Sequence, residues 1–285
     1  MQYIPYCVIP TFLMPLSGNN NAPNSRFLKA SLVTNGDNTM SWFNDEHFWS
    51  LFYEWMFPEE SFHQAEDQVD DIIKITGVKS GAVLDLCCGP GRHSVPFVKK
   101  GFQVTGVDLQ PILMKKAREY SINENVNVEY IEEDMLTFKR FDSFDLVISM
   151  FSSFGYFRDS EDDFRVLENV FDSMKPGGKL LMDVRGKEIH AMGNVRSFSQ
   201  EMPNGDLIFH RTEVNEDWTR SHADWIYVHD DKAHRFEMSV NLYCGSELRA
   251  LIQKAGFSGV QVYGDLKGGP YNQNAKRLVI VAEKT

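Results

Sequence analysis

Short apolar runs alternate with helical segments between residues 80 and 185. The apolar runs are AVLDLC, QVTGVD, VNVEYIEED, FDLVISMF and KLLMDV, and the intervening segments are RHSVPFVKK, PILMKKAREY and EDDFRVLENVFDSM. Near-continuous apolar strands that alternate with helices are typical of a parallel sheet covered on both faces. The pattern therefore predicts an α/β protein with a doubly wound, mostly parallel sheet.

The periodicity changes between residues 196 and 243. Polar and apolar residues alternate there, and the turn-forming sequences PNGD, NED and HDDK interrupt them, which predicts antiparallel strands. The first pattern resumes in SELRALIQKAG, GVQVYGD and RLVIVAEK. We therefore expect a core of residues 80–195 and 244–285, with an antiparallel insert of residues 196–243 after the fifth strand.

The N-terminal part divides into two segments. Residues 17–40 are rich in Asn, Ser and Gly and lack periodicity, so we expect residues 1–39 to form a disordered tail and Met40 to start the functional protein. Residues 40–79 contain an aromatic cluster, HFWSLFYEWMF, and then apolar residues at helical spacing. This second segment is predicted to be a helical lid, and the alternative for its aromatic cluster is that it packs in the core.

Composition limits the functions that the chain can have. Its 285 residues are 42% hydrophobic, enough for one large core, and no apolar run approaches the length of a membrane span. The spacing of the four cysteines indicates neither a disulfide framework nor a zinc site. These features predict a cytoplasmic protein without a metal and without a membrane partner.

The net charge of −11 argues against a nucleic-acid partner, because binding would need a basic patch that the sequence does not show. Residues 186–243 contain six Lys and Arg against ten Asp and Glu, a net charge of −4. A small or cationic substrate is easier to accommodate.

The stretch VLDLCCGPGRHS reads as a strand, a glycine turn and the start of a helix, as in nucleotide-type sites. A dinucleotide site needs a third glycine and free backbone N–H groups, but here Ser94 takes that position and Pro90 lacks an N–H. The Asp85 carboxylate would repel a diphosphate and attract a cation. S-adenosylmethionine, with its sulfonium, ammonium and adenosine groups, meets these requirements.

This stretch resembles motif I of the class I S-adenosylmethionine-dependent methyltransferases, and the resemblance covers about residues 80–185 and 246–284. Gly89 and Gly91 follow Asp85 as in that family, while Cys87 replaces the first glycine of the commonest pattern. The resemblance implies that these four residues contact the cofactor. Arg92 is either a partner of the cofactor carboxylate or a solvated residue of the first helical turn.

Further positions match the cofactor site of the family. The resemblance assigns Asp108 to the ribose hydroxyls, Leu109 to the adenine slot, and Asp134 and Met135 to the adenine amino group and ring. The stretch FDLVISMFSSFGYF, which contains Met150, resembles the motif that passes the methionine end of the cofactor. Related enzymes fold an N-terminal helix with a tyrosine over that end, which singles out Tyr53. The alternative for Asp85 and Asp108 is that they only cap the turn and helix that follow them.

The resemblance also suggests where the methyl acceptor binds. Small-molecule methyltransferases that act on amines and amino sugars have a similar insert, which would cap the acceptor pocket or pair across a dimer. Candidate acceptor-binding residues are Tyr156, Arg185, His190, Asp265 and Tyr271. For each of them a purely structural role is the alternative, and His190 would then face solvent.

The sequence thus predicts a small-molecule methyltransferase, monomeric or homodimeric, with nitrogen favoured over oxygen or carbon as the acceptor atom. Because the sulfonium already activates the methyl group, alignment and exclusion of water carry the reaction and no catalytic triad is expected. The alternatives are a nicotinamide-dependent dehydrogenase, a protein or RNA methyltransferase, and a non-catalytic module that binds S-adenosylmethionine.

Overall fold

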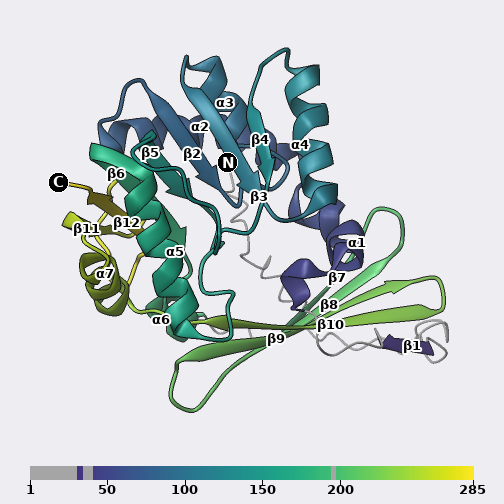
Figure 1. Ribbon diagram of the computed structural model, residues 1–285. Helices are drawn as coiled ribbons and strands as arrows, with labels where there is room; N and C mark the ends of the chain where they lie inside the picture. The colour runs from purple at the N-terminus through teal and green to yellow at the C-terminus, as the bar shows by residue number, and fades with distance from the viewer. Residues whose placement is uncertain (1–30, 35–40, 194–196) are drawn as a thin grey trace.

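The computed structural model describes residues 31–34, 41–193 and 197–285 (Figure 1). The predictions for residues 1–30 and 35–39, and for Met40 as the start, lie outside the described residues. Within the segment predicted as a tail, the backbone of Ser31–Thr34 forms strand β1. This strand pairs in parallel with β10 (Lys232–Asn241) of the insert.

The core is a seven-stranded sheet in the order β11-β12-β6-β5-β2-β3-β4. The strands are β2 (Ala82–Leu86), β3 (Gln103–Asp108), β4 (Glu129–Glu132), β5 (Phe144–Ser149), β6 (Met174–Val184), β11 (Ser258–Tyr263) and β12 (Leu278–Glu283). Neighbouring strands from β4 to β6 pair in parallel, and β12 runs antiparallel to both of its neighbours. The predicted mostly parallel sheet is confirmed.

Helices cover both faces of this sheet. On one face, α2 (Glu59–Thr76) and α3 (Ser94–Lys99) bury Val69, Ile72 and Phe97 against the strands. On the other face, α5 (Ser160–Ser173) and α7 (Gly245–Lys254) do so with a second set of apolar residues. α4 (Pro111–Asn123) lies against β3 and β4. The apolar runs of the strands are therefore explained by burial on both sides.

The insert forms a separate antiparallel sheet, as predicted. Its strands are β7 (Ser197–Glu201), β8 (Leu207–Val214), β9 (Arg220–His229) and β10, and the short helix α6 (Lys187–Met192) precedes them. In Figure 1 this sheet lies below the core, and α1 (Glu46–Met56) lies between the two. Phe48 and Phe52 of α1 are completely buried against Trp225, Tyr227 and Phe236 of the insert.

Several element boundaries differ from the sequence prediction, among them the starts of α3 and β6. α3 begins at Ser94, two residues later than expected. The segment KPGG, expected to close the preceding helix, belongs to β6, which begins at Met174. The cause is tertiary pairing, because the Gly177 N–H donates to the carbonyl of Lys284, the residue after β12, at 2.6 Å.

Candidate active site

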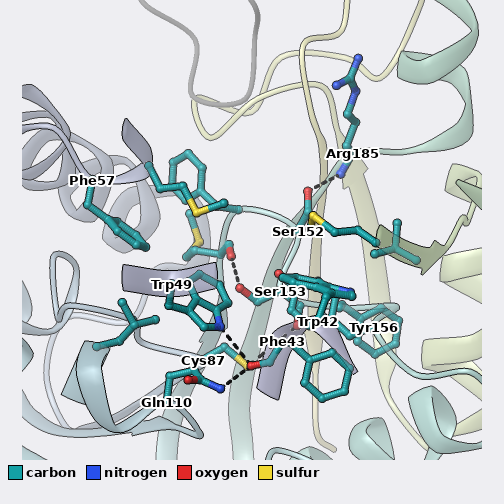
Figure 2. A pocket seen from close by; sticks show the side chains of 18 of the residues that line it. Trp42, Phe43, Trp49, Phe57, Cys87, Gln110, Ser152, Ser153, Tyr156 and Arg185 are labelled. Carbon is teal, nitrogen blue, oxygen red and sulfur yellow. Dashed lines mark hydrogen bonds between the residues drawn. The ribbon is translucent and has the colours of Figure 1, made fainter. Parts of the chain in front are cut away.

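A cavity of about 850 Å³ opens at the carboxyl ends of β2, β3, β5 and β6. β2 lies between β3 and β5, so the chain order reverses there, which is the usual ligand position in doubly wound sheets. Three parts of the chain form the walls: the loops after these strands, the segment from Trp42 to Glu59, and the inner face of the insert sheet. Figure 2 shows the side chains that meet there.

The glycine turn after β2 forms the floor of the cavity. Cys87 has a left-handed φ of 60°, which is uncommon for a residue with a side chain, and Gly89 has a φ of 55°. The Cys87 sulfur contacts the Met135 sulfur at 3.4 Å. Cys87 therefore occupies a backbone conformation that favours glycine, the residue common in the family at this position.

Asp85 is buried at the end of β2 and accepts a hydrogen bond from the Ser94 hydroxyl at 2.6 Å. Burial raises the pKa of its carboxyl to about 6, although the Ser94 bond and the nearby Arg92 act in the opposite direction. A buried carboxyl of this kind is stabilised in its ionised form by a cation.

Asp108 links the glycine turn to the start of α4. One carboxylate oxygen accepts from the Gly89 N–H at 2.8 Å and the other from the Gln110 N–H at 2.9 Å. The carboxylate thus supports local structure, as the capping alternative requires, and it also lines the cavity. Burial raises its pKa.

The remaining predicted adenine-side residues lie at the same end of the cavity. Leu109, Asp134 and Met135 all line it. Asp134 accepts a hydrogen bond from the Leu136 N–H at 2.8 Å, which fixes the turn after β4. Met135 is buried and packs with the apolar residues of the core.

Arg92 and Met150 lie where β5 ends. The guanidinium of Arg92 stands 3.7 Å from the centre of the Phe151 ring, and both residues line the cavity. His93 stacks on the same ring at 5.7 Å and is hydrogen bonded to Gln68 at 2.8 Å. Arg92 is buried, so a solvated position is excluded for it.

A second wall consists of an aromatic group, formed by Trp42 and Phe43 of the N-terminal segment together with Tyr156. Phe43 stacks on Tyr156 with ring centres 5.8 Å apart, and Trp42 meets the same ring edge-on at 4.7 Å. The Phe43 carbonyl accepts hydrogen bonds from the Trp49 indole at 3.0 Å and from the Gln110 amide (Figure 2). Gln110 therefore ties this segment to the cofactor end of the cavity.

The insert forms the third wall. Phe198, His210 and Trp225 line the cavity, and His210 meets Trp225 edge-on at 4.6 Å. Burial, with Arg185 nearby, lowers the pKa of His210 to about 4. Burial lowers the pKa of His190 to about 4 as well, with further effects from Arg185 and Arg277.

Hydrogen bonds fix the insert to the core beside this wall. The Asn241 N–H donates to the Gly155 carbonyl at 2.6 Å, and the Asn241 side-chain amide donates to Asp163 at 2.7 Å. The Tyr243 hydroxyl donates to the same Asp163 oxygen at 2.6 Å. Asp163 is completely buried. These hydrogen bonds hold the loop that carries Tyr156 against the end of β10.

The cavity brings together twelve of the sixteen candidate site residues: Asp85, Cys87, Gly89, Arg92, Asp108, Leu109, Asp134, Met135, Met150, Tyr156, Arg185 and His190. His190 lines the cavity and is half-buried, which does not favour the solvent-facing alternative. The Arg185 N–H donates to the Ser152 hydroxyl at 3.0 Å, and in Figure 2 the Arg185 side chain extends away from the aromatic group.

Three predicted residues lie elsewhere. Tyr53 lines a separate cavity of about 590 Å³ beside α4, where the Lys116 ammonium lies 5.3 Å from the centre of its ring. Gly91 does not line the main cavity, and a Cβ atom there would collide with the Tyr130 hydroxyl. The Tyr271 hydroxyl donates to Glu188 at 2.8 Å behind the cavity wall.

Asp265, also considered at the sequence level, accepts from the N–H groups of Lys267 and Gly269, both at 2.9 Å, and so shapes its own loop. The sequence reasoning missed several residues that line the cavity: Trp42, Phe43, Trp49, Phe57, His93, Gln110, Phe198, His210 and Trp225. The aromatic clustering near residue 48 was the available signal for the N-terminal ones.

The residues present fit S-adenosylmethionine. Asp85 and Asp108 supply buried carboxylates for a cationic ligand with hydroxyl groups, and Phe57 lies above the turn, 3.6 Å from where a Cβ atom on Gly89 would stand. Arg92, the cation closest to the turn in sequence, stands over the Phe151 ring. This donor set suits a cation better than a diphosphate.

Comparisons with known proteins agree with the fold. A family model described as a methyltransferase domain matches residues 83–178. A Bacillus subtilis (strain 168) protein named as a methyltransferase is 25% identical over 235 residues, which cover 81% of this chain and 95% of that protein. Glycine N-methyltransferase of Rattus norvegicus is 28% identical over 228 residues, covering 66% of this chain and 73% of that protein.

Among solved structures, an S-adenosylmethionine-dependent methyltransferase from Clostridium acetobutylicum ATCC 824 superimposes with a TM-score of 0.66 at 15% identity, covering 83% of this chain and 96% of that chain. This likeness shows a shared fold. Fold, cavity and family match together define a class I S-adenosylmethionine-dependent methyltransferase. The chain is therefore an enzyme whose cofactor is S-adenosylmethionine, and the methyltransferase family model matches residues 83–178 of it.

Proposed function

We propose that this enzyme transfers the methyl group of S-adenosylmethionine to a nitrogen atom of a small organic molecule bound between the aromatic group and the insert sheet. The observation that carries the proposal is the character of the insert wall. The residues that the insert strands contribute to the cavity include no charged side chain, although residues 186–243 have six Lys and Arg against ten Asp and Glu. The acceptor wall is therefore uncharged and combines aromatic, aliphatic and neutral polar side chains.

An uncharged wall suits an amine acceptor. A protonated amine has no lone pair for attack, and burial favours its neutral form because the charged form loses solvation. His190 and His210 respond to this environment, with pKa values lowered to about 4. An amine bound in this cavity is expected to lose its proton more easily than in water, so the reaction needs no dedicated base.

S-adenosylmethionine supplies an activated methyl group at its sulfonium. The protein binds and orients the cofactor and the acceptor, and it excludes water from them. Tyr156 is held between Phe43 and Trp42, and its loop is fixed by Asn241 and Asp163. Alignment and exclusion of water of this kind account for several kcal/mol of a barrier, within the roughly 7–11 available from proximity.

The similar proteins support nitrogen as the acceptor atom. They include glycine N-methyltransferases and, at 25% identity over 115 residues, an N,N-dimethyltransferase of a dTDP-linked amino sugar from Streptomyces venezuelae.

The described helices include none that is long and apolar enough to cross a membrane. We infer a cytoplasmic enzyme that acts as a monomer or homodimer.

The test is an acceptor screen that measures S-adenosylhomocysteine formation. The panel contains amines of increasing size, from glycine to aromatic amines and amino sugars, each with its hydroxyl analogue. With the best acceptor, Phe198→Ala is expected to raise KM at least several-fold and to leave cofactor affinity unchanged. The reason is that Phe198 lines the insert wall of the cavity, where its ring stacks on Trp55 of α1 with ring centres 5.8 Å apart. Phe209→Ala, on the exposed face of the neighbouring strand, is the matched control. Turnover with hydroxyl analogues alone, or with protein or RNA alone, would contradict the proposal.

A further inference from the structure

The turn that follows β5 has an unusual backbone. Phe151 and Ser152 are consecutive residues with left-handed φ angles of 58° and 68°. Such angles are uncommon outside glycine and are true outliers for bulky residues. They persist only where the surroundings impose them, and they concentrate at functional sites. Both residues line the cavity next to Met150, so this strained turn forms part of the cofactor site.

Hydrogen bonds from two other strand ends impose the conformation of Ser152. Its N–H donates to the Asp183 carbonyl at 2.8 Å. Its hydroxyl oxygen accepts from the Arg185 N–H at 3.0 Å and from the Arg277 guanidinium at 3.0 Å. These bonds connect the end of β5 to the end of β6 and to the residue just before β12.

Arg277 holds this arrangement from the opposite side of the cavity wall. Its guanidinium donates to the Asp183 carboxylate at 2.6 Å and to the Asp183 carbonyl at 3.3 Å. Both side chains are largely buried, with exposed fractions of 17% for Arg277 and 3% for Asp183. The same guanidinium lies 5.6 Å from the centre of the Phe151 ring. Arg277 itself does not line the cavity.

We propose that Arg277 is a positioning residue for the cofactor: it acts through Ser152 to hold the left-handed turn in the conformation that presents Met150 and Phe151 to the methionine end of S-adenosylmethionine. Without Arg277 the turn relaxes toward ordinary backbone angles. Cofactor binding must then restore the strained conformation. The apparent affinity is therefore the intrinsic affinity multiplied by the fraction of molecules in which the turn still has that conformation.

The experiment compares glycine with alanine at position 152. Arg277→Gln should weaken S-adenosylmethionine and S-adenosylhomocysteine about tenfold in calorimetry, which corresponds to about 1.4 kcal/mol. Adding Ser152→Gly should recover most of that loss, because glycine adopts a positive φ without a steric penalty. Adding Ser152→Ala removes the same hydroxyl but keeps the penalty, so it should recover none. Arg235→Gln, which breaks an exposed ion pair with Asp224 on the insert sheet, is the control and should leave both affinities unchanged.

Thermal melting of each variant shows whether it is folded. If Arg277→Gln does not fold, Arg277→Lys replaces it, since lysine retains the charge but not the forked donor geometry. An affinity within twofold of the parent in a folded Arg277 variant would overturn the proposal, and so would equal affinities for the glycine and alanine double variants. No acceptor enters these measurements, so their failure would leave the proposed nitrogen acceptor untouched.

Discussion

Replacing Asp108 by Asn tests the assignment of the ribose end of the cofactor site. The carboxylate accepts from the N–H groups of Gly89 and Gln110, and we expect it to accept from the two ribose hydroxyls as well. Asparagine retains one oxygen, so one of the two N–H groups loses its acceptor. That defect exists with and without cofactor, and it therefore lowers the stability of the fold but cancels in the binding constant.

The loss of affinity then reflects the hydroxyl bonds alone. Hydrogen bonds to a charged acceptor contribute about 1.5–3 kcal/mol each. The asparagine side chain in the variant can still accept some of the hydrogen bonds from the ribose hydroxyls. We expect a loss of about 2–4 kcal/mol, which is roughly 30- to 1000-fold in Kd. Calorimetry with S-adenosylhomocysteine measures it, and Glu132→Gln is the control, because Glu132 pairs with Asp108 in the sheet but is exposed. A change below about threefold, together with a lower melting temperature, would show that Asp108 serves only to cap the turn.

Three further predictions concern the turn and the insert. The pKa of Asp85 is raised from 3.8 to about 6, so the folded protein without cofactor binds an extra proton between these two pH values and loses stability as the pH rises through this range. A cationic cofactor favours the ionised carboxylate, so cofactor affinity should rise between pH 5 and 7. Asp85→Asn should abolish the pH dependence of stability in thermal melting and that of affinity in calorimetry. Cys87→Gly should be about 1 kcal/mol more stable to urea than Cys87→Ala, because both lose the sulfur but only glycine relieves the positive φ; equal stabilities would argue against strain. Replacing residues 196–243 by a Gly-Ser linker should abolish the cooperative melting of α1, since its two buried phenylalanines pack on that sheet, and a normally folded α1 in hydrogen exchange would contradict this packing.

The cofactor side of the site could be predicted because its determinants are local. The strand, the glycine turn and the carboxylates at strand ends follow from a few adjacent residues, and parallel strands bring their carboxyl ends to one edge. Asp85, Asp108 and Asp134 thus meet in the cavity although up to 49 positions separate them in the sequence.

The walls contributed by α1 could not be predicted in the same way. This helix is apolar on several sides, so periodicity does not indicate which neighbour each side chain faces. Phe48 and Phe52 pack on the insert, Trp49 faces the cavity, and Tyr53 faces α4. The position of Tyr271 outside the cavity could not be predicted for a related reason, since its hydrogen-bond partner Glu188 lies 83 residues away in the sequence.

The three-walled cavity has a consequence for how the enzyme can change. The carboxylates assigned to the cofactor lie at the ends of β2, β3 and β4, whereas much of the acceptor wall consists of inward-facing side chains on β7 to β10. Alternate residues of these strands can be exchanged without disturbing the backbone ladder that holds the sheet together. The inner face of the insert is therefore the place where mutation can broaden or redirect acceptor choice while the methyl-donor machinery stays intact, which makes it the natural target for a combinatorial library.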